Sequence, residues 1–182
     1  MTSSDMYVAL LRAINLGAKN RVPMKDLAEM FVAAGCRDVS TYIQSGNVIF
    51  NAPAALLKKL PEMISAQISA RFGFQVPVII RSSQQLARTI ANNPFLQAGE
   101  PETALHVMFL ADLPAAESIT TLDMQRSPPD RFHVWENNIY LHHPKGVRNS
   151  KLTNAYFDAK LSTQSTARNW ATVLKLAELS SR

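Results

Sequence analysis

The sequence predicts an α+β protein with antiparallel-rich sheets, built from two similar ferredoxin-like halves. Over the first half, short apolar and β-branched runs alternate with amphipathic stretches in the order strand-helix-strand-strand-helix-strand, which is the ferredoxin-like pattern. The second half contains a related strand-helix-hairpin-helix order. The hairpin segment 42–50 also aligns without a gap with residues 133–141, and this alignment indicates a structural duplication.

The elements of the first half follow from residue spacing. The run MYVALL is continuous and apolar, which is typical of a buried strand. Ser45-Gly46-Asn47 separates two alternating runs and therefore predicts a hairpin turn. Leu and Ile recur every four residues in a longer helix that ends at Gly73. In order, we expect a strand at 6–11, a helix from Pro23 to Gly35, a hairpin over 39–50, a helix at 54–72 and a strand at 74–80.

The second half is expected to begin after a connecting segment. Asn92-Asn93-Pro94 and the following Gly99 and Pro101 are typical of a linker, so we place the two subdomains at 1–91 and 92–182. Ser82 or Ser83 is expected to cap a short helix before this linker, and Ser150 to cap a later one. In order, the remaining elements are a strand at 105–110, a helix over 115–124, a hairpin over 132–141 and helices at 151–160 and 166–179.

The charge distribution, the cysteine and histidine content and the lengths of the apolar segments indicate which kinds of ligand, cofactor and partner to expect. The net charge is +5, and basic segments at 1–91 and 145–182 flank an acidic segment at 92–144. The basic segments could form an anion-binding surface, or they could be neutralised by the acidic segment between them. Cys36 is the single cysteine, and the histidines lack the spacing of a zinc site, so we expect no disulfide, no metal and no cofactor. No segment is long and apolar enough for a signal core or a membrane span, which predicts a cytoplasmic protein without a membrane partner.

Three polar segments contain the candidate ligand-binding residues. The loop 12–24 leaves a strand and enters the N-terminus of a helix, where backbone N–H groups and a positive dipole end attract anions. The hairpin turn and the two C-terminal helices provide the other two segments. The opposing interpretation is an ordinary solvated loop, turn and helix face. The candidates are Arg12, Asn15, Asn20, Arg21, Gln44, Ser45, Asn47, Lys151, Asn154, Arg168, Asn169 and Lys175.

Five strings in the chain resemble one protein family. They are LLRAINLGAKNRVPM, TYIQSGNVIF, NNPF, SKLTN and ARNWATVLKL, and together the sequence resembles the domain of unknown function 1697 family over essentially its whole length. The resemblance implies the two-part α+β fold and no activity. Ala13 and Ala18 stand where members of the family often have Gly. The signature positions that it implies are Arg12, Asn15, Gly17, Asn20, Met24, Gln44, Ser45, Gly46, Asn47, Lys151, Thr153, Asn154, Arg168, Asn169 and Trp170.

Three functional hypotheses follow from these patterns. The first is a protein that binds a phosphate-bearing ligand, a nucleotide or a nucleic acid, through the basic polar loop and the C-terminal Arg/Lys/Asn cluster. The second is a small metal-independent enzyme acting on an anionic substrate, whose candidate side chains would have to converge in one cleft. The third is a protein-interaction module, which would present an exposed apolar patch.

Overall fold

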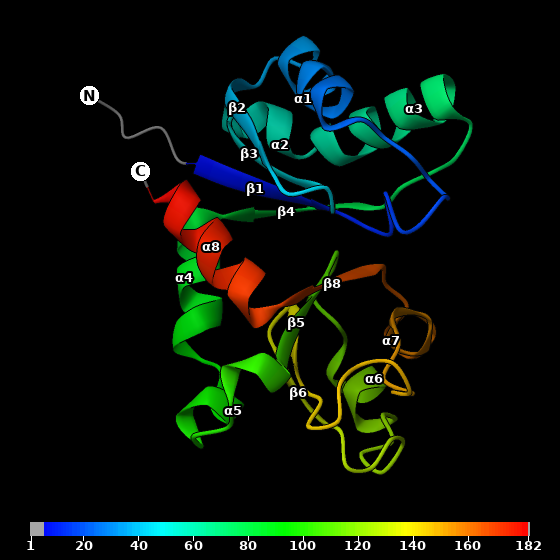
Figure 1. Cartoon of the computed structure of the whole chain (residues 1–182), viewed down its shortest axis with the longest axis vertical. Coiled ribbons are helices and arrows are strands. Elements are labelled where there is room, and N and C mark those ends of the chain that lie inside the picture. Colours follow the sequence, from blue (N-terminus) through cyan, green and yellow to red (C-terminus); the bar gives the residue numbers. More distant parts are fainter. Residues whose placement is uncertain (1–5, 182) are drawn as a thin grey trace. The chain divides into compact units, whose positions relative to one another are not determined.

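A computed structural model describes residues 6–181, and the chain divides into two compact units (Figure 1). The first unit contains the described residues up to Ala87 and those from Lys175 onward, and the second is Arg88–Leu174. Helix α4 (Ser83–Ala91) leads from the first unit into the second, and helix α8 (Trp170–Ser180) leads back. No helix among the described residues combines the length and the apolar character that a membrane span needs.

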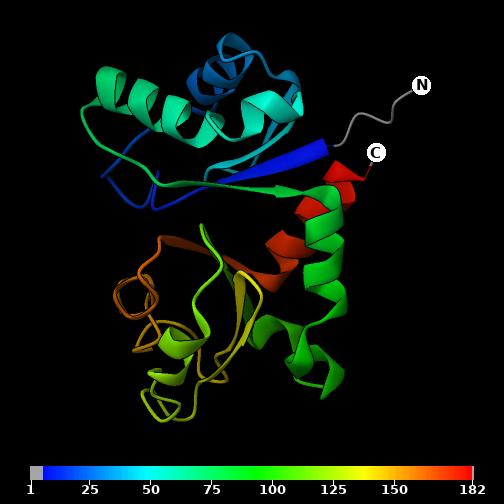
Figure 2. The same cartoon turned by 180° about the vertical axis from the view of Figure 1, so that it is seen from behind.

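The first unit is one four-stranded sheet with helices on one face. Its sheet has the order β2-β3-β1-β4, and every neighbouring pair is antiparallel. The helices α1 and α3 lie together on one face of this sheet in both views (Figures 1 and 2). The elements are β1 (Met6–Leu11), α1 (Met24–Ala33), β2 (Arg37–Tyr42), β3 (Asn47–Asn51), α2 (Ala54–Leu57), α3 (Leu60–Phe72) and β4 (Val78–Ser82).

The core of this unit lies between the sheet and the helices. It is formed by side chains at alternate positions of the strands and by the apolar side chains along one face of each helix. Leu27 and Phe31 of α1 and Ile64 of α3 are fully buried, and they join Ala9 and Phe50 of the sheet in one cluster. Burial of each large apolar side chain contributes about 1.5–3 kcal/mol, which is why the spacing of these residues determines the helix face. The thiol of Cys36 is buried in the same core.

The second unit repeats this arrangement. Its sheet has the order β6-β7-β5-β8, which corresponds strand by strand to that of the first unit, and it is again antiparallel throughout. The elements are α5 (Pro94–Gln97), the 3-10 helix η1 (Glu102–Ala104), β5 (Leu105–Leu110), α6 (Ala116–Thr120), β6 (Arg131–Trp135), β7 (Asn138–His142), α7 (Asn154–Leu161) and β8 (Ser165–Asn169).

Strand register shows how closely the two units correspond. The central strand of the first unit pairs Val8 with Arg81, and that of the second pairs Val107 with Arg168. The amide of Leu11 donates to the carbonyl of Gly46 at 2.8 Å, and in the second unit Leu110 donates to Asn137 at 2.9 Å. An α+β fold with two similar halves is therefore confirmed.

Two predicted helices differ in kind from the structure, and three other elements differ in their ends: the strand expected at 74–80 is Val78–Ser82, and the helices expected at 115–124 and 151–160 are Ala116–Thr120 and Asn154–Leu161. The helix expected at 54–72 is divided into α2 and α3, because Pro61 lies in the first turn of α3 and its ring cannot follow a continuous helical backbone. The helix expected at 166–179 begins only at Trp170. The preceding segment is strand β8, because it pairs with the central strand β5 and completes the sheet of the second unit.

Three local predictions also need correction. Pro23 is the N-cap of α1 and not its first helical residue. Thr153, and not Ser150, caps α7, since its hydroxyl oxygen accepts from the amide of Tyr156 at 3.2 Å. The two hairpins do not align through their turns: β2 and β3 are joined by four residues, 43–46, whereas β6 and β7 are joined by Glu136-Asn137. The cap of α4 is Ser82, as expected, and forms a reciprocal capping box with Gln85.

Candidate functional site

The loop between β1 and α1 is held in place by its own polar side chains. The Asn15 side chain accepts from the amide of Val22 and donates to the Val22 and Gln44 carbonyls, each at 2.9 Å. The Asn20 side chain donates to the Ala13 carbonyl at 3.3 Å. Of the predicted cations in the loop, Arg12 is half-buried and Arg21 is exposed. The loop and the hairpin turn are thus neighbours, as the prediction of a shared site requires, but Asn15 and Asn20 are engaged with the loop backbone.

The hairpin turn is packed against the same loop. Asn47 is fully buried and donates to the Tyr42 carbonyl at 3.1 Å and to the Ser45 hydroxyl at 3.0 Å. Gln44 contributes its backbone carbonyl to the bond from Asn15. Gly46 has a φ of +76°, and a Cβ at this position would lie 2.8–2.9 Å from atoms of Leu11 and Ile14. The turn therefore requires glycine for two separate reasons, backbone conformation and close packing.

Three of the predicted C-terminal residues have local hydrogen-bond or ion-pair partners. Asn154 donates to the hydroxyl of Ser165 at 2.8 Å, and Ser165 donates to Asp158 at 2.6 Å. Asn169 caps α8 by accepting from the amide of Thr172 at 2.8 Å. Lys175 belongs to the first unit, and its ammonium group forms an ion pair with the Glu178 carboxylate at 2.8 Å. Lys151 is exposed in the segment before α7.

Arg168 has a counterpart that sequence analysis did not identify. It is buried on β8 and donates to the Thr166 hydroxyl and the Ala167 carbonyl, each at 2.8 Å. Arg81 is buried at the same register position of β4 and donates to the preceding carbonyl, that of Ile80, at 3.0 Å. Burial lowers the pKa of both guanidinium groups to about 10, so both remain charged at neutral pH. Both units thus place a buried arginine at the same register position of the strand that pairs with their central strand.

A cavity of about 290 Å³ lies on the helix-facing side of the sheet in the second unit. Its floor is made by alternate residues of three strands and the residue after β7, and its cover is the segment between His143 and the start of α7. The floor residues are His106, Met108, Leu141, His143 and Ala167, and the cover residues are Val147, Ser150, Leu152, Thr153 and Asn154. The lining is mainly apolar with a few polar groups, which is typical of small-molecule sites.

Two histidines and a buried carboxylate are the titratable groups at this cavity. The imidazole of His143 lines it, and its Nδ1 lies 3.5 Å from Oδ2 of the buried Asp130. The ring of His106 stands edge-on to that of His143, with 5.3 Å between the ring centres. The Ser127 hydroxyl donates to Asp130 Oδ2 at 2.9 Å and accepts from the amide of Lys151 at 3.0 Å. The carboxylate is thus fixed behind His143, and the same hydroxyl attaches the cover segment.

The electrostatic environment keeps both imidazoles neutral at pH 7. Burial lowers the pKa of His106, and the neighbouring His143 lowers it further. Burial also lowers the pKa of His143, although the carboxylate of Asp130 acts in the opposite direction. A neutral imidazole offers one hydrogen-bond donor and one acceptor, and a proton on Nδ1 of His143 would face Asp130 and leave Nε2 as the acceptor.

The same three positions in the first unit hold residues that pack in or against the hydrophobic core. By strand register, His106 corresponds to Tyr7, and His143 follows β7 as Ala52 follows β3. Asp130 precedes β6 as Cys36 precedes β2. Ala52 and Cys36 are buried in the core of the first unit, and the partly buried Tyr7 packs against it. Two units of the same topology therefore differ here, and the fold itself does not require a histidine or an aspartate at these positions.

The cover of the cavity belongs to a basic segment. Residues 144–157 contain no Asp or Glu, and Lys145, Arg148 and Lys151 in this segment are all exposed. The segment is attached at Lys151, whose carbonyl accepts from Nε of Arg126 at 3.0 Å. The Arg126 guanidinium in turn stacks 3.9 Å from the ring centre of Tyr156. Exposed cations thus lie beside the residues that line the cavity.

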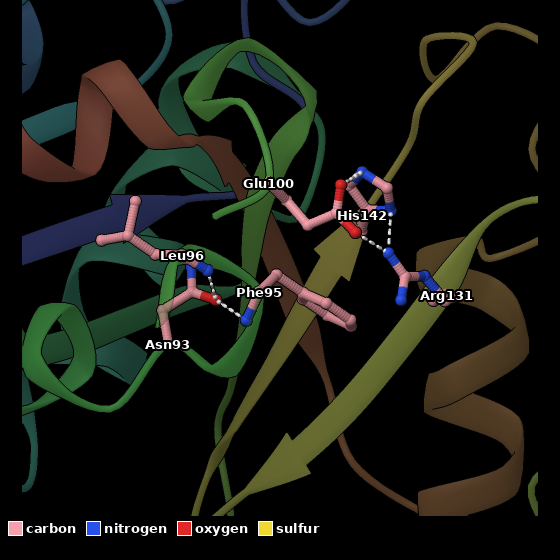
Figure 3. A network of polar contacts seen from close by, with 6 residues as sticks. All are labelled: Asn93, Phe95, Leu96, Glu100, Arg131 and His142. Carbon is pink, nitrogen blue, oxygen red and sulfur yellow. Dashed lines mark hydrogen bonds and ion pairs between the residues drawn. The ribbon is translucent and has the colours of Figure 1, made fainter. Parts of the chain in front are cut away.

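His142 belongs to a separate cluster on the other face of the sheet (Figure 3). Its Nε2 lies 3.3 Å from Glu100, its Nδ1 lies 3.1 Å from Arg131, and its ring stacks on Phe95. Arg131 also pairs with Glu100. The side chains of His142 and His143, adjacent at the end of β7, therefore lie on opposite faces of the sheet, as the alternation of side chains along a strand requires.

Sequence reasoning finds Asn154 and Lys151 near this cavity but misses its titratable groups. His106 and His143 look like isolated histidines in the sequence, and Asp130 belongs to no motif. Their signal is present in the comparison of the two halves, because each occupies a position where the first half has neither a histidine nor an acid. Within residues 6–181, no group of three or more side chains is arranged to hold a metal ion.

Comparisons with known proteins agree with this fold. A family model described as "Protein of unknown function (DUF1697)" matches residues 5–140. A solved structure, that of the conserved bacterial protein SP0830 from Streptococcus pneumoniae, superposes with a TM-score of 0.72 at 20% sequence identity and covers 98% of this chain and 99% of that one. At this identity the likeness shows the fold alone. No protein with a curated description matches the sequence.

Proposed function

This chain belongs to the DUF1697 family, and we propose that it binds a small phosphate-bearing ligand, such as a nucleotide, in the cavity of its second unit. The observation that carries the proposal is the presence of His106 and His143 at the cavity, with Asp130 behind His143, where the first unit has Tyr7, Ala52 and Cys36 packed in or against its core. A buried titratable group costs free energy unless it is compensated, so its presence at a cavity where the fold does not require it indicates a functional site.

The interior of the cavity suits an uncharged ring. Met108, Leu141 and Ala167 provide apolar contacts, and the two neutral imidazoles provide hydrogen-bond partners. The volume is at the lower end of the range of roughly 300–1,000 Å³ that is usual for ligand pockets. A single base or a similar ring is therefore a better fit than an extended polymer.

The phosphate is assigned to the exposed part of the cover. Lys145, Arg148 and Lys151 provide positive charge next to the cavity without a neighbouring acid in residues 144–157. Thr153 and Asn154 begin α7 and line the cavity, so the positive end of this helix adds to the attraction. Lys151 and Asn154 of the predicted C-terminal cluster thus retain a ligand role in this proposal, and Arg12 and Arg21 of the first unit take no part in it.

The proposal is tested by thermal shift and calorimetric titration with nucleoside monophosphates and inorganic phosphate. A ligand at 100 times its Kd stabilises the folded protein by about 2.7 kcal/mol. Arg148→Ala with Lys151→Ala should weaken nucleotide binding at least about tenfold, since each charge-assisted hydrogen bond contributes about 1.5–3 kcal/mol. Lys58→Ala with Lys59→Ala removes the same charge from the exposed surface of the first unit and should leave the affinity unchanged.

A second variant distinguishes the contribution of the ligand's ring to binding from that of its phosphate. Ala167→Leu places extra carbon atoms on the cavity floor, so it should reduce nucleotide affinity while leaving the affinity for inorganic phosphate unchanged. If no phosphate compound stabilises the protein at millimolar concentration, or if both double variants lose affinity equally, the proposal is wrong. Binding of oligonucleotides with a steep salt dependence would instead favour a nucleic-acid surface.

A further inference from the structure

We infer that Asp130 and His143 form a carboxylate–imidazole pair that accepts a proton from water in the cavity and so hydrolyses a carboxylic ester of the bound ligand. The inference deepens the proposed function and rests on it, because it names a reaction for the same cavity. The reaction step depends on the cavity and the pair, and the phosphate contacts of the ligand do not enter it.

The geometry has the parts that a general base needs, with the carboxylate and the imidazole in contact at ion-pair distance, slightly beyond hydrogen-bond distance. His143 lines the cavity, and its Nδ1 is 3.5 Å from the Asp130 carboxylate. The side chains of both residues are more than nine-tenths buried, with 3% and 7% of their surface exposed. A carboxylate behind Nδ1 favours the tautomer with the proton on that nitrogen, and Nε2 is then the basic atom. The amide of His143 donates to the Ala104 carbonyl at 2.8 Å, which fixes the backbone that carries the imidazole.

The carboxylate is itself held in position. The hydroxyl of Ser127 donates to Asp130 Oδ2 at 2.9 Å, and the amide of Asp130 donates to the Ser127 carbonyl at 2.7 Å. The charged and titratable groups that act on the His143 imidazole are Asp130, which favours its protonation, and His142, which disfavours it. The ring of His106 also stands edge-on to the His143 ring. At neutral pH the imidazole is free to accept a proton, and Asp130 stabilises the imidazolium that forms.

The lining of the cavity favours a carboxylic ester over a phosphate ester as the bond that breaks. Phosphoryl transfer needs cations at the reacting centre, but Lys145, Arg148 and Lys151 are exposed and none of them is among the residues that line the cavity. An acyl transfer needs neutral donors for the carbonyl oxygen. The hydroxyl oxygens of Ser150 and Thr153 accept from backbone amides at 3.1 and 3.2 Å, so their hydrogens can donate to a ligand oxygen.

The reaction step balances without a further reactant. Nε2 of His143 takes a proton from water as the water oxygen forms a bond to the ester carbonyl carbon. The carbon–oxygen bond to the leaving group then breaks, and its electron pair stays with the departing alkoxide. The imidazolium returns its proton to that oxygen, and the products are a carboxylic acid and an alcohol.

The test uses the full chain and p-nitrophenyl acetate, a small carboxylic ester whose hydrolysis releases p-nitrophenolate. The protein should hydrolyse this probe with saturation, and His143→Gln should lower the rate about tenfold or more, since a positioned base contributes about 10²–10⁴-fold. Asp130→Asn should lower the rate and change the tautomer of His143, which nitrogen NMR detects. His133→Gln, at an exposed histidine of β6, should keep the full rate.

The pH dependence of the hydrolysis rate distinguishes a role of His143 as a base from a purely structural role. The rate should depend on neutral His143 and decrease with acidity through a pKa below 6.5. If His143→Gln is folded by circular dichroism and as fast as the wild type, or if His133→Gln loses the same rate, the inference is overturned. If the protein binds no nucleotide but still hydrolyses the ester in a His143-dependent way, the proposed ligand is refuted and the Asp130–His143 pair is supported. If it binds nucleotides but does not hydrolyse the ester, the inference about the pair is overturned and the proposed ligand stands.

Discussion

Gly46→Ala should destabilise the first unit far more than a glycine substitution in open space. Gly46 has a φ of +76°, a region that costs an L residue about 1–2 kcal/mol. The new Cβ would lie 2.8 Å from Leu11 Cβ and 2.9 Å from two atoms of Ile14. Leu11 and Ile14 are almost completely buried, so neither can move away easily. Overpacking of this kind costs about 1–3 kcal/mol more, and the sum is about 2–5 kcal/mol.

Gly17 offers the matched control, because it lies in the same unit at a φ of +62° and a Cβ there would meet nothing within 4 Å. Gly17→Ala should therefore cost only the backbone contribution of about 1–2 kcal/mol. Urea denaturation followed by circular dichroism measures both changes, and the difference between the two variants isolates the packing cost. Equal destabilisation of Gly46→Ala and Gly17→Ala would show that the turn and the loop do not pack as described.

The remaining predictions concern polar groups. Asn15→Ala should cost about 1–3 kcal/mol more than Asn20→Ala in urea denaturation, because it leaves the partners of three bonds unpaired, whereas Asn20→Ala removes one long, exposed bond. Both residues lie at a positive φ, 55° and 51°, so the backbone cost of alanine is common to the two variants and cancels in the difference. Equal costs would contradict this. The pKa of His106 is lowered in the folded protein, so the unfolded chain binds more protons just below pH 6.5 and stability should fall as the pH drops through that range. His106→Gln should make this decrease shallower, and an unchanged slope would remove His106 as its cause. If Arg81 and Arg168 are equivalent structural residues, Arg81→Met and Arg168→Met should each cost about 1–3 kcal/mol by the same assay, and a cost in only one of them would contradict the equivalence.

Strand and helix periodicity predicts most of the first unit, because local spacing and burial agree there. Residues 6–11 form β1 as expected, and the hairpin turn falls at residues 43–46. The segment 165–169 is harder, because the spacing of Arg168, Thr172 and Lys175 also fits a helix. It forms a strand because β5 offers an unpaired edge to it, and that edge exists only once the sheet has formed. Pairing with a distant strand outweighs local propensity.

The candidate site is predictable only in part. The basic loop and the Ser-Gly-Asn turn do lie together, but the bonds of Asn15 and Asn47 show that these polar side chains hold the backbone of the loop and the turn. Their types are equally compatible with a ligand, since Asn is common in both roles. The pair at the cavity escapes sequence reasoning because Asp130 and His143 are 13 positions apart and no motif joins them.

The sequence by itself determined the fold class, the duplication and most helix and strand positions, because each of these depends on the period of apolar residues along a short segment. Only the tertiary structure decided which polar residues meet. The sheet places His106 beside His143, and the turn before β6 places Asp130 behind it. Contacts of this kind depend on strand register and loop path, which are set by the packing of the whole second unit and leave no local pattern in the chain.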